Sequence, residues 1–347
     1  METTRKRIEY LDIAKGIGIL LVVWFHARGP YLRYIMHFHM PFFFLISGYL
    51  YNAGAGLGHF IRRKVTSLYI PFVFWNLFFY LLRRHGELFT NPASFRRHIL
   101  LIVTTLDKDG AFCGATWFLG SLFLMSILYK LIDTLLPAFA AKRLVLLAVF
   151  TVISGVGFYY DFPYRFSRTL ILGIFFAIGA CVKEYKDRLS LFARPVTTVL
   201  FAAGFILIAN HTDVNMGSHV YSNPLLFVPE ACMASFVVVR LSILLEKAAN
   251  RFAAVRPCKN AFLYMGKKSL DIVIWQFVFF GVPSMCRMIL DSQPLLLNDV
   301  MAYYRVGDPT HLWWIAYVIA GTALPLAWCA FLRSGPWGRI FTKIHIV

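Results

Sequence analysis

Residues 311–332 read HLWWIAYVIAGTALPLAWCAFL, a run of 22 residues without Asp, Glu, Lys or Arg. About 20 apolar residues in a helix cross the hydrocarbon core of a bilayer, so this run is long enough to span a membrane. Comparable runs occur at 9–27, 34–53, 66–82, 115–136, 144–160, 166–182, 195–211, 224–245 and 269–290. We therefore predict about ten transmembrane helices. The apolar segment 97–106 is too short to span, and we expect it at the interface or re-entrant.

The composition favours the same fold class. The 347 residues are 59% hydrophobic and only 15% charged, whereas soluble domains have about 25% charged residues. A soluble protein of this composition would need an implausibly large core. We predict an all-α, polytopic integral membrane bundle formed by residues 1–347 as a single domain.

The net charge of +18 is distributed in short clusters between the apolar runs. This pattern is typical of cytoplasmic loops in membrane proteins, and it argues against a nucleic-acid partner. If the N-terminus is cytoplasmic, the inner segments contain twice as many Lys and Arg residues as the outer ones. We therefore expect both termini in the cytoplasm.

Three ionisable residues lie inside the first run, where charge is costly and often functional. Asp12 and Lys15 are three residues apart, so they can pair on one helix face. His26 follows Lys15 by eleven residues, almost three turns, which places it about 16 Å further along the same face. The alternatives are a neutralised pair near a helix end and an ordinary interfacial histidine.

The second run begins with His37-Phe38-His39-Met40-Pro41. His37, His39 and His26 could form one imidazole cluster, and imidazole transfers protons near neutral pH. A metal site is the alternative, but no carboxylate or cysteine joins these histidines in ligand spacing. The six cysteines are scattered and include no CxxC pair. We expect no metal.

Three adjacent cations, Arg62, Arg63 and Lys64, follow the second run. Such a group binds phosphates well. Basic residues at a cytoplasmic helix end are also ordinary topology signals and contacts for lipid headgroups. Both interpretations stay open from the residues alone.

Together these residues resemble the acyltransferase 3 family of integral membrane acyltransferases, especially its fucose 4-O-acetyltransferase-like branch. The matching motifs are YLDIAKGIGIL at 10–20 with His26, FHMP at 38–41, FFLISGY at 43–49, Arg62-Arg63 with Pro71, TWFL at 116–119 and GKKSL at 266–270. The family signature of a basic residue, ten residues and a histidine is kept by Lys15 and His26. The first two motifs together are the most specific.

The chain departs from the family pattern at three places. Lys15 stands where much of the wider family has arginine, and Trp24-Phe25 replaces the usual glycine before His26. Many members carry a histidine in the ninth span, where this chain has Trp275-Gln276. A role for a histidine there is therefore not transferable.

The resemblance implies transfer of an acyl group, usually acetyl, from cytoplasmic acyl-CoA such as acetyl-CoA to a hydroxyl of a sugar or surface-glycan precursor. It implies a multi-pass protein of the bacterial cytoplasmic membrane, in contact with membrane lipids. The competing interpretation is a transporter or flippase for a saccharide or its lipid carrier, since buried charge within many spans also fits that class.

We predict these roles for the candidate residues. His26 is the base for the acceptor hydroxyl or a transient acyl carrier, and His39 is a second proton-handling group. Lys15, held by Asp12, steadies acyl-CoA or the charge that develops on the thioester. The nucleotide phosphates are gripped at the cytoplasmic mouth by Arg62, Arg63 and Lys64.

Overall fold

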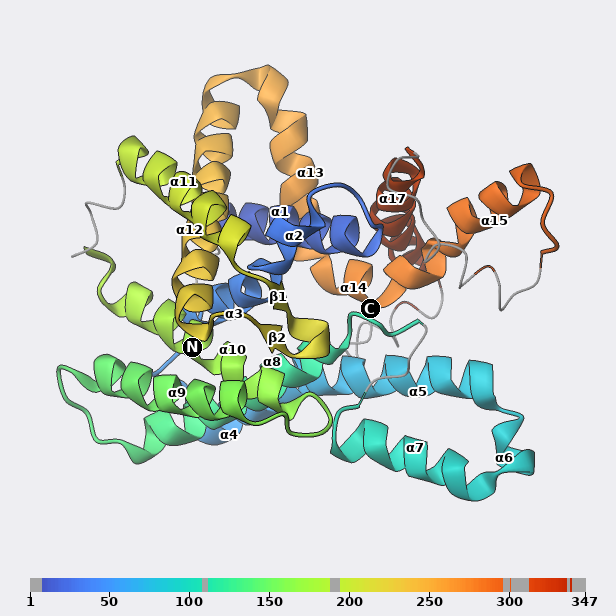
Figure 1. The fold of residues 1–347 in the computed structure, drawn as a ribbon, viewed down its shortest axis with the longest axis horizontal. Coiled ribbons are helices and arrows are strands. Elements are labelled where there is room, and N and C mark those ends of the chain that lie inside the picture. Colours follow the sequence, from blue (N-terminus) through green and yellow to red (C-terminus); the bar gives the residue numbers. More distant parts are fainter. Residues whose placement is uncertain are drawn as a thin grey trace.

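The computed structural model describes residues 8–107, 112–187, 194–295 and 312–335, together with Val300 and Gly338. The described part is helical except for one short hairpin (Figure 1). The helices are α1 (Glu9–His26), α2 (Leu32–Met36), α3 (His39–Tyr49), α4 (Leu57–Lys64), α5 (Ile70–Arg84), α6 (Glu87–Thr90), α7 (Pro92–Thr104), α8 (Trp117–Leu135), α9 (Lys142–Tyr159), α10 (Phe166–Glu184), α11 (Pro195–His211), α12 (Pro224–Arg251), α13 (Arg256–Lys267), α14 (Ser269–Phe279), α15 (Gly281–Leu290) and α17 (Trp313–Ser334).

Short elements connect several of these helices. The π-helical turn η1 (Val65–Tyr69) joins α4 and α5, and 3-10 turns lie at η3 (Met216–Ser218) and η4 (Ala253–Val255). Strands β1 (Val214–Asn215) and β2 (Val220–Tyr221) pair antiparallel between α11 and α12, with Val214 opposite Tyr221.

The helical membrane class is confirmed. In the described residues, seven helices are long and apolar enough to span a bilayer: 57–84, 117–135, 142–159, 166–184, 224–251, 269–290 and 313–334. Helix α11 is apolar but has 17 residues, and α1 carries charged residues in its first two turns. The count of ten spans and the cytoplasmic position of both termini stay predictions.

The run 34–53 does not form the single helix that its hydropathy predicts. It is divided into α2 and α3 by a turn at His37 and Phe38, where Phe38 has φ −139° and ψ −15°. Pro41 lies in the first turn of α3 and has no N–H to donate to the carbonyl four residues earlier. A proline is favoured in a first turn and weakens a helix interior, so Pro41 favours a helix start here, although α12 and α17 contain Pro229 and Pro325 within continuous helices.

Helix α1 lies in the middle of the molecule (Figure 1), against α3, α12, α13, α14 and α17. Its contact with α13 is made through glycines. A Cβ at Gly16 would lie 1.9 Å from the carbonyl oxygen of Phe262, and one at Gly266 would lie 1.7 Å from that of Asp12. Only glycine lets two helix backbones approach so closely. These glycines therefore fix the height of α1 against α13.

Helix α3 is held against α10 in the same way. A Cβ at Gly48 would lie 1.9 Å from the carbonyl oxygen of Phe176, and one at Gly179 would lie 2.0 Å from that of Leu45. Helices α5, α6 and α7 form a separate arm at the lower right of Figure 1. Tyr69 donates a hydrogen bond to the carbonyl of Val103 at the base of this arm.

Candidate active site

The first two candidate residues form the predicted ion pair. Lys15 Nζ lies 2.5 Å from Asp12 Oδ1, and the Asp12 side chain is buried while that of Lys15 is 22% exposed. The main-chain carbonyl of Asp12 touches Gly266, so the pair is located where α1 crosses α13. The spacing of three residues was therefore a sufficient signal for this contact.

His26 and His39 are brought together around one aromatic ring. His26 ends α1, and His39 begins α3. The Phe25 ring stacks on His39 at 5.1 Å and meets His26 edge-on at 5.3 Å. Phe277 of α14 contacts His26 from a second helix, at 4.9 Å. Two of the three predicted imidazoles thus share one aromatic environment.

The tautomer of His39 follows from its main-chain contact. Its Nδ1 lies 2.8 Å from the carbonyl oxygen of Ile35. A carbonyl only accepts, so Nδ1 carries the proton in neutral His39 and Nε2 keeps its lone pair. A histidine held in this way can receive a proton at Nε2.

His37 has a different neighbour. Its Nδ1 lies 2.8 Å from Glu230 Oε1 on α12, and both side chains are completely buried. Thr212 donates a hydrogen bond of 2.9 Å to the other carboxylate oxygen of Glu230. Glu230 was missed by the sequence reasoning, although it is the only carboxylate in the run 224–245.

The three predicted phosphate-binding cations are not equivalent. Arg62 and Arg63 are exposed on α4, whereas Lys64 turns inward with its Nζ 5.5 Å from the centre of the Phe60 ring. The Nζ of Lys130 lies 5.9 Å from the same ring and donates to the carbonyl of Ala53. Lys64 therefore borders a basic cluster inside the protein, which consists of Lys130, Lys142 and Arg143.

Asp133 is the carboxylate at the centre of this basic cluster. It accepts a 2.5 Å hydrogen bond from Tyr51, and Lys142 and Arg143 lie at 3.1 Å and 3.0 Å. Lys142 also donates to the carbonyls of Asp133 and Leu136 at the end of α8. Cations stabilise the negative end of a helix, so this cluster ties α8 and α9 to the segment after α3.

The TWFL motif packs near the candidate site. Asn76 of α5 donates a 3.1 Å hydrogen bond to the buried hydroxyl of Thr116. A Cβ at Gly114 would lie 2.8 Å from the Phe277 ring, which itself contacts His26. The segment before α8 thus supports the aromatic wall of His26.

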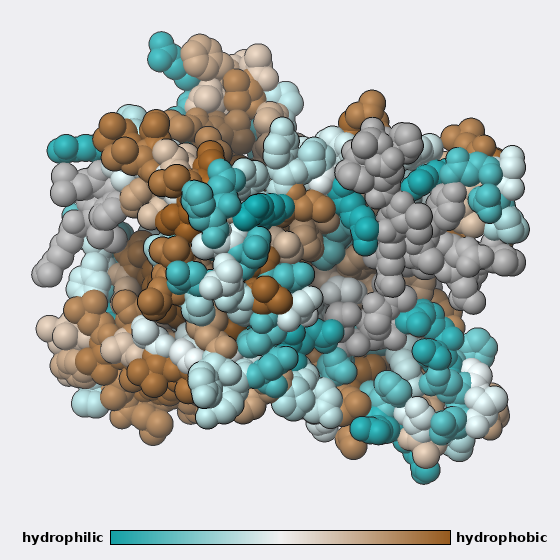
Figure 2. Space-filling view, viewed as in Figure 1, coloured by the Kyte–Doolittle hydropathy of each residue, from teal (hydrophilic) through white to brown (hydrophobic). Residues whose placement is uncertain are grey.

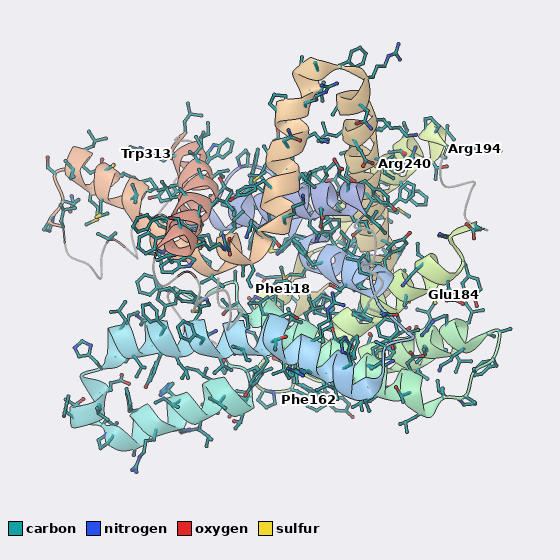
Figure 3. All side chains as sticks on the ribbon, turned by 180° about the vertical axis from the view of Figure 1, so that it is seen from behind. Phe118, Phe162, Glu184, Arg194, Arg240 and Trp313 are labelled. Carbon is teal, nitrogen blue, oxygen red and sulfur yellow. The ribbon has the colours of Figure 1, made fainter. Side chains whose placement is uncertain are left out.

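One cavity among the described residues is an apolar groove of about 630 Å³. Tyr10 and Leu11 of α1 line it, with residues of α3, α10, α11 and α12, and Lys186, Asp187 and Arg240 add charge. Figure 3 shows Arg240 and Glu184 on the same side of the molecule, far from Trp313. A cavity of about 420 Å³ lies between 104–106, 117–124 and 162–169. His26 lines neither of these two cavities.

Across the described residues, no group of three or more His, Cys, Asp or Glu side chains has an arrangement that could hold a metal ion. The candidate site consists of His26, His39 and the Asp12–Lys15 pair. These groups supply two imidazoles and one cation on adjoining helices.

Comparison with known proteins gives one family match, to the acyltransferase domain of the acyltransferase 3 type, over residues 8–334. The nodulation protein NolL of Mesorhizobium japonicum is 29% identical over 147 residues, which cover 38% of this chain and 37% of that protein. NolL of Sinorhizobium fredii is 24% identical over 247 residues, covering 66% of this chain and 63% of its own. The chain thus spans less than two thirds of either relative. No solved structure matches significantly.

Proposed function

Because the chain belongs to the acyltransferase 3 family, we propose that it is a membrane-embedded O-acyltransferase. It moves an acyl group, acetyl in the first instance, from cytoplasmic acyl-CoA to a hydroxyl of a sugar or surface-glycan precursor. The observation that supports this proposal is that the rings of His26 and His39 both contact the Phe25 ring. This contact lies at the opposite end of α1 from the Asp12–Lys15 pair. We place the protein in the bacterial cytoplasmic membrane.

The distance along α1 separates the two functions. Eleven residues at 1.5 Å each put Lys15 about 16 Å from His26 along the helix axis. A group that stabilises an oxyanion must lie within about 3 Å of it. Lys15 is therefore too far from His26 to stabilise charge on a thioester reacting there, and its role is to hold the donor. The phosphates of the same acyl-CoA donor are bound by Arg62, Arg63 and Lys64.

The chemistry at His26 is an acyl transfer. The acceptor oxygen forms a bond to the carbonyl carbon, the carbon–sulfur bond breaks, and the hydroxyl proton finally neutralises the released CoA thiolate. Imidazole serves this reaction as a base or as a transient acyl carrier. Phe25 and Phe277 give His26 an apolar setting that strengthens electrostatic interactions with the reacting groups.

The test is to replace His26 with alanine and follow transfer of radiolabelled acetyl from acetyl-CoA by purified protein to candidate glycan acceptors. We expect His26→Ala to abolish transfer while the protein stays inserted and monodisperse. His98→Ala is the matched control, because His98 is exposed on α7, where it bonds to Ser94 and stacks on Tyr80. Normal transfer by His26→Ala would refute the mechanism. Substrate flux into liposomes without label transfer would instead support a transporter.

A further inference from the structure

A second imidazole site lies outside the His26–His39 pair. His37, in the turn between α2 and α3, meets Glu230 of α12 across 2.8 Å. Because a carboxylate accepts, His37 Nδ1 carries the proton and Nε2 is left with its lone pair. This Nε2 is buried and has no hydrogen-bond partner among the residues that the structure describes. Glu230 therefore fixes Nδ1, while the lone pair of Nε2 is not used in a hydrogen bond within the described residues.

Two hydrogen bonds hold the Glu230 side chain in place. Its Oε1 accepts from His37 and its Oε2 accepts from Thr212 Oγ1 at 2.9 Å. A carboxylate inside a membrane helix is costly, and a neutral glutamine could accept the same hydrogen bond from Nδ1. What the carboxylate adds is stabilisation of an imidazolium after Nε2 receives a proton, as in carboxylate–histidine pairs of hydrolases.

The pair lies beneath a polar surface. Arg33 of α2 donates to the carbonyls of Asn210 and Thr212 and meets Asp213 at 3.2 Å, and Tyr34 donates to Asn210. Figure 2 shows hydrophilic residues gathered over the connection from α1 to α2 and over the β hairpin, with apolar residues beside them over α11 and α12. By the predicted orientation this is the outer face, where a sugar would arrive.

The pair also adjoins the first imidazole site. His39 follows His37 by two residues and stacks on Phe25, the neighbour of His26. The turn between α2 and α3 therefore presents His39 towards α1 and His37 towards α12. His37 therefore lies beside the place where we locate the acyl group, beneath this polar surface and completely buried.

We propose that His37 Nε2 binds the acceptor hydroxyl and takes its proton, and that Glu230 is the positioning residue for His37. The ligand class is an alcohol, here a sugar hydroxyl, and the inference rests on the proposed acyl transfer. The acceptor O–H bond breaks as its oxygen bonds to the acyl carbon, the proton goes to His37, and CoA leaves as thiolate and later receives that proton. Of the two roles proposed for His26, this leaves that of transient acyl carrier, which takes the acyl group from the thioester as the carbon–sulfur bond breaks and gives it to the acceptor oxygen.

The experiment uses three variants of the full-length protein with acetyl-CoA and the acceptor found for the unaltered protein. His37→Asn keeps a donor for Glu230 but removes the base, and Glu230→Gln keeps an acceptor for His37 but removes the charge. Ser242→Ala is the control, because Ser242 is also completely buried on α12 and its hydroxyl donates to the carbonyl of Val239 in the same helix. We expect kcat to fall about 100-fold or more in the first two variants. The KM for acetyl-CoA and the activity of Ser242→Ala should not change.

A parallel measurement of folded protein, by gel filtration and thermal unfolding, separates a chemical role from a structural one. If the variants lose activity only in proportion to lost folded protein, the pair is a structural tie and the inference is overturned. Normal kcat in well-folded His37→Asn overturns it as well. If the unaltered protein transfers no acetyl to any acceptor, the proposed function itself fails, which is distinguishable because it precedes any substitution.

Discussion

Replacing Gly266 with alanine tests whether the contact between α1 and α13 organises the site. The new Cβ would lie 1.7 Å from the carbonyl oxygen of Asp12 and 2.9 Å from the nitrogen of Gly16. Ordinary contact begins at 3.4 Å, so α1 and α13 must separate or rotate by more than 1 Å. Both obstacles are backbone atoms, which cannot move aside as a side chain does.

The expected magnitude follows from two opposing effects. Overpacking costs about 1–3 kcal/mol, and the upper end applies where backbone is the obstacle. Alanine recovers up to about 1 kcal/mol of helix propensity relative to glycine. We therefore expect Gly266→Ala to lower the free energy of unfolding by about 2–3 kcal/mol. It should also raise the KM for acetyl-CoA because Asp12 and Lys15 are displaced.

Gly155 provides the matched control. It lies inside α9, and a Cβ there would meet nothing within 4 Å. Gly155→Ala should therefore leave transfer unchanged and keep or raise the apparent melting temperature in detergent. The assay is thermal unfolding of both variants, with acetyl transfer measured on the same samples. If Gly266→Ala has the same melting temperature and the same KM for acetyl-CoA as the unaltered protein, the close glycine contact does not set the position of the ion pair.

Two further predictions concern charged groups. Lys15→Ala should raise the KM for acetyl-CoA about tenfold, because a charged contact with the donor is lost. The increase should be larger than that caused by Lys64→Ala, and steady-state kinetics in detergent gives both values. If Lys64→Ala has the larger effect, the donor is recognised mainly at the surface. Asp133→Asn should lower the free energy of unfolding by about 3–5 kcal/mol, because it leaves Lys142 and Arg143 beside a neutral side chain. Thermal unfolding measures this loss, and an unchanged melting temperature would show that the carbonyls alone satisfy these cations.

The sequence predicts those features whose signal is local. Hydropathy identifies most of the long helices because each span must be apolar along its own length. The Asp12–Lys15 pair follows from a spacing of three residues on one helix. Hydropathy does not register the break between α2 and α3, because His37 and Phe38 lie within an apolar run. Pro41 was the available sign of that break.

The contacts that the sequence reasoning missed join distant segments. Glu230 and His37 are 193 residues apart, so no spacing rule connects them. The usable signal was a carboxylate in an apolar run, because such a residue needs a polar partner in the bilayer. Lys130 and Asp133, both buried in α8, gave the same signal in the run 115–136.

The position of α1 explains how a predicted span that contains an ion pair carries the candidate chemistry. A helix facing lipid cannot keep Asp12 and Lys15 without large cost. Helix α1 instead packs against six other helices, and its glycines let α13 approach to backbone contact. The protein itself thus replaces lipid around the ion pair at one end of α1 and around His26 at the other. Because both groups are fixed on one buried helix, the distance between the proposed donor-binding group and the proposed acyl-transfer group is set by helix geometry rather than by loops.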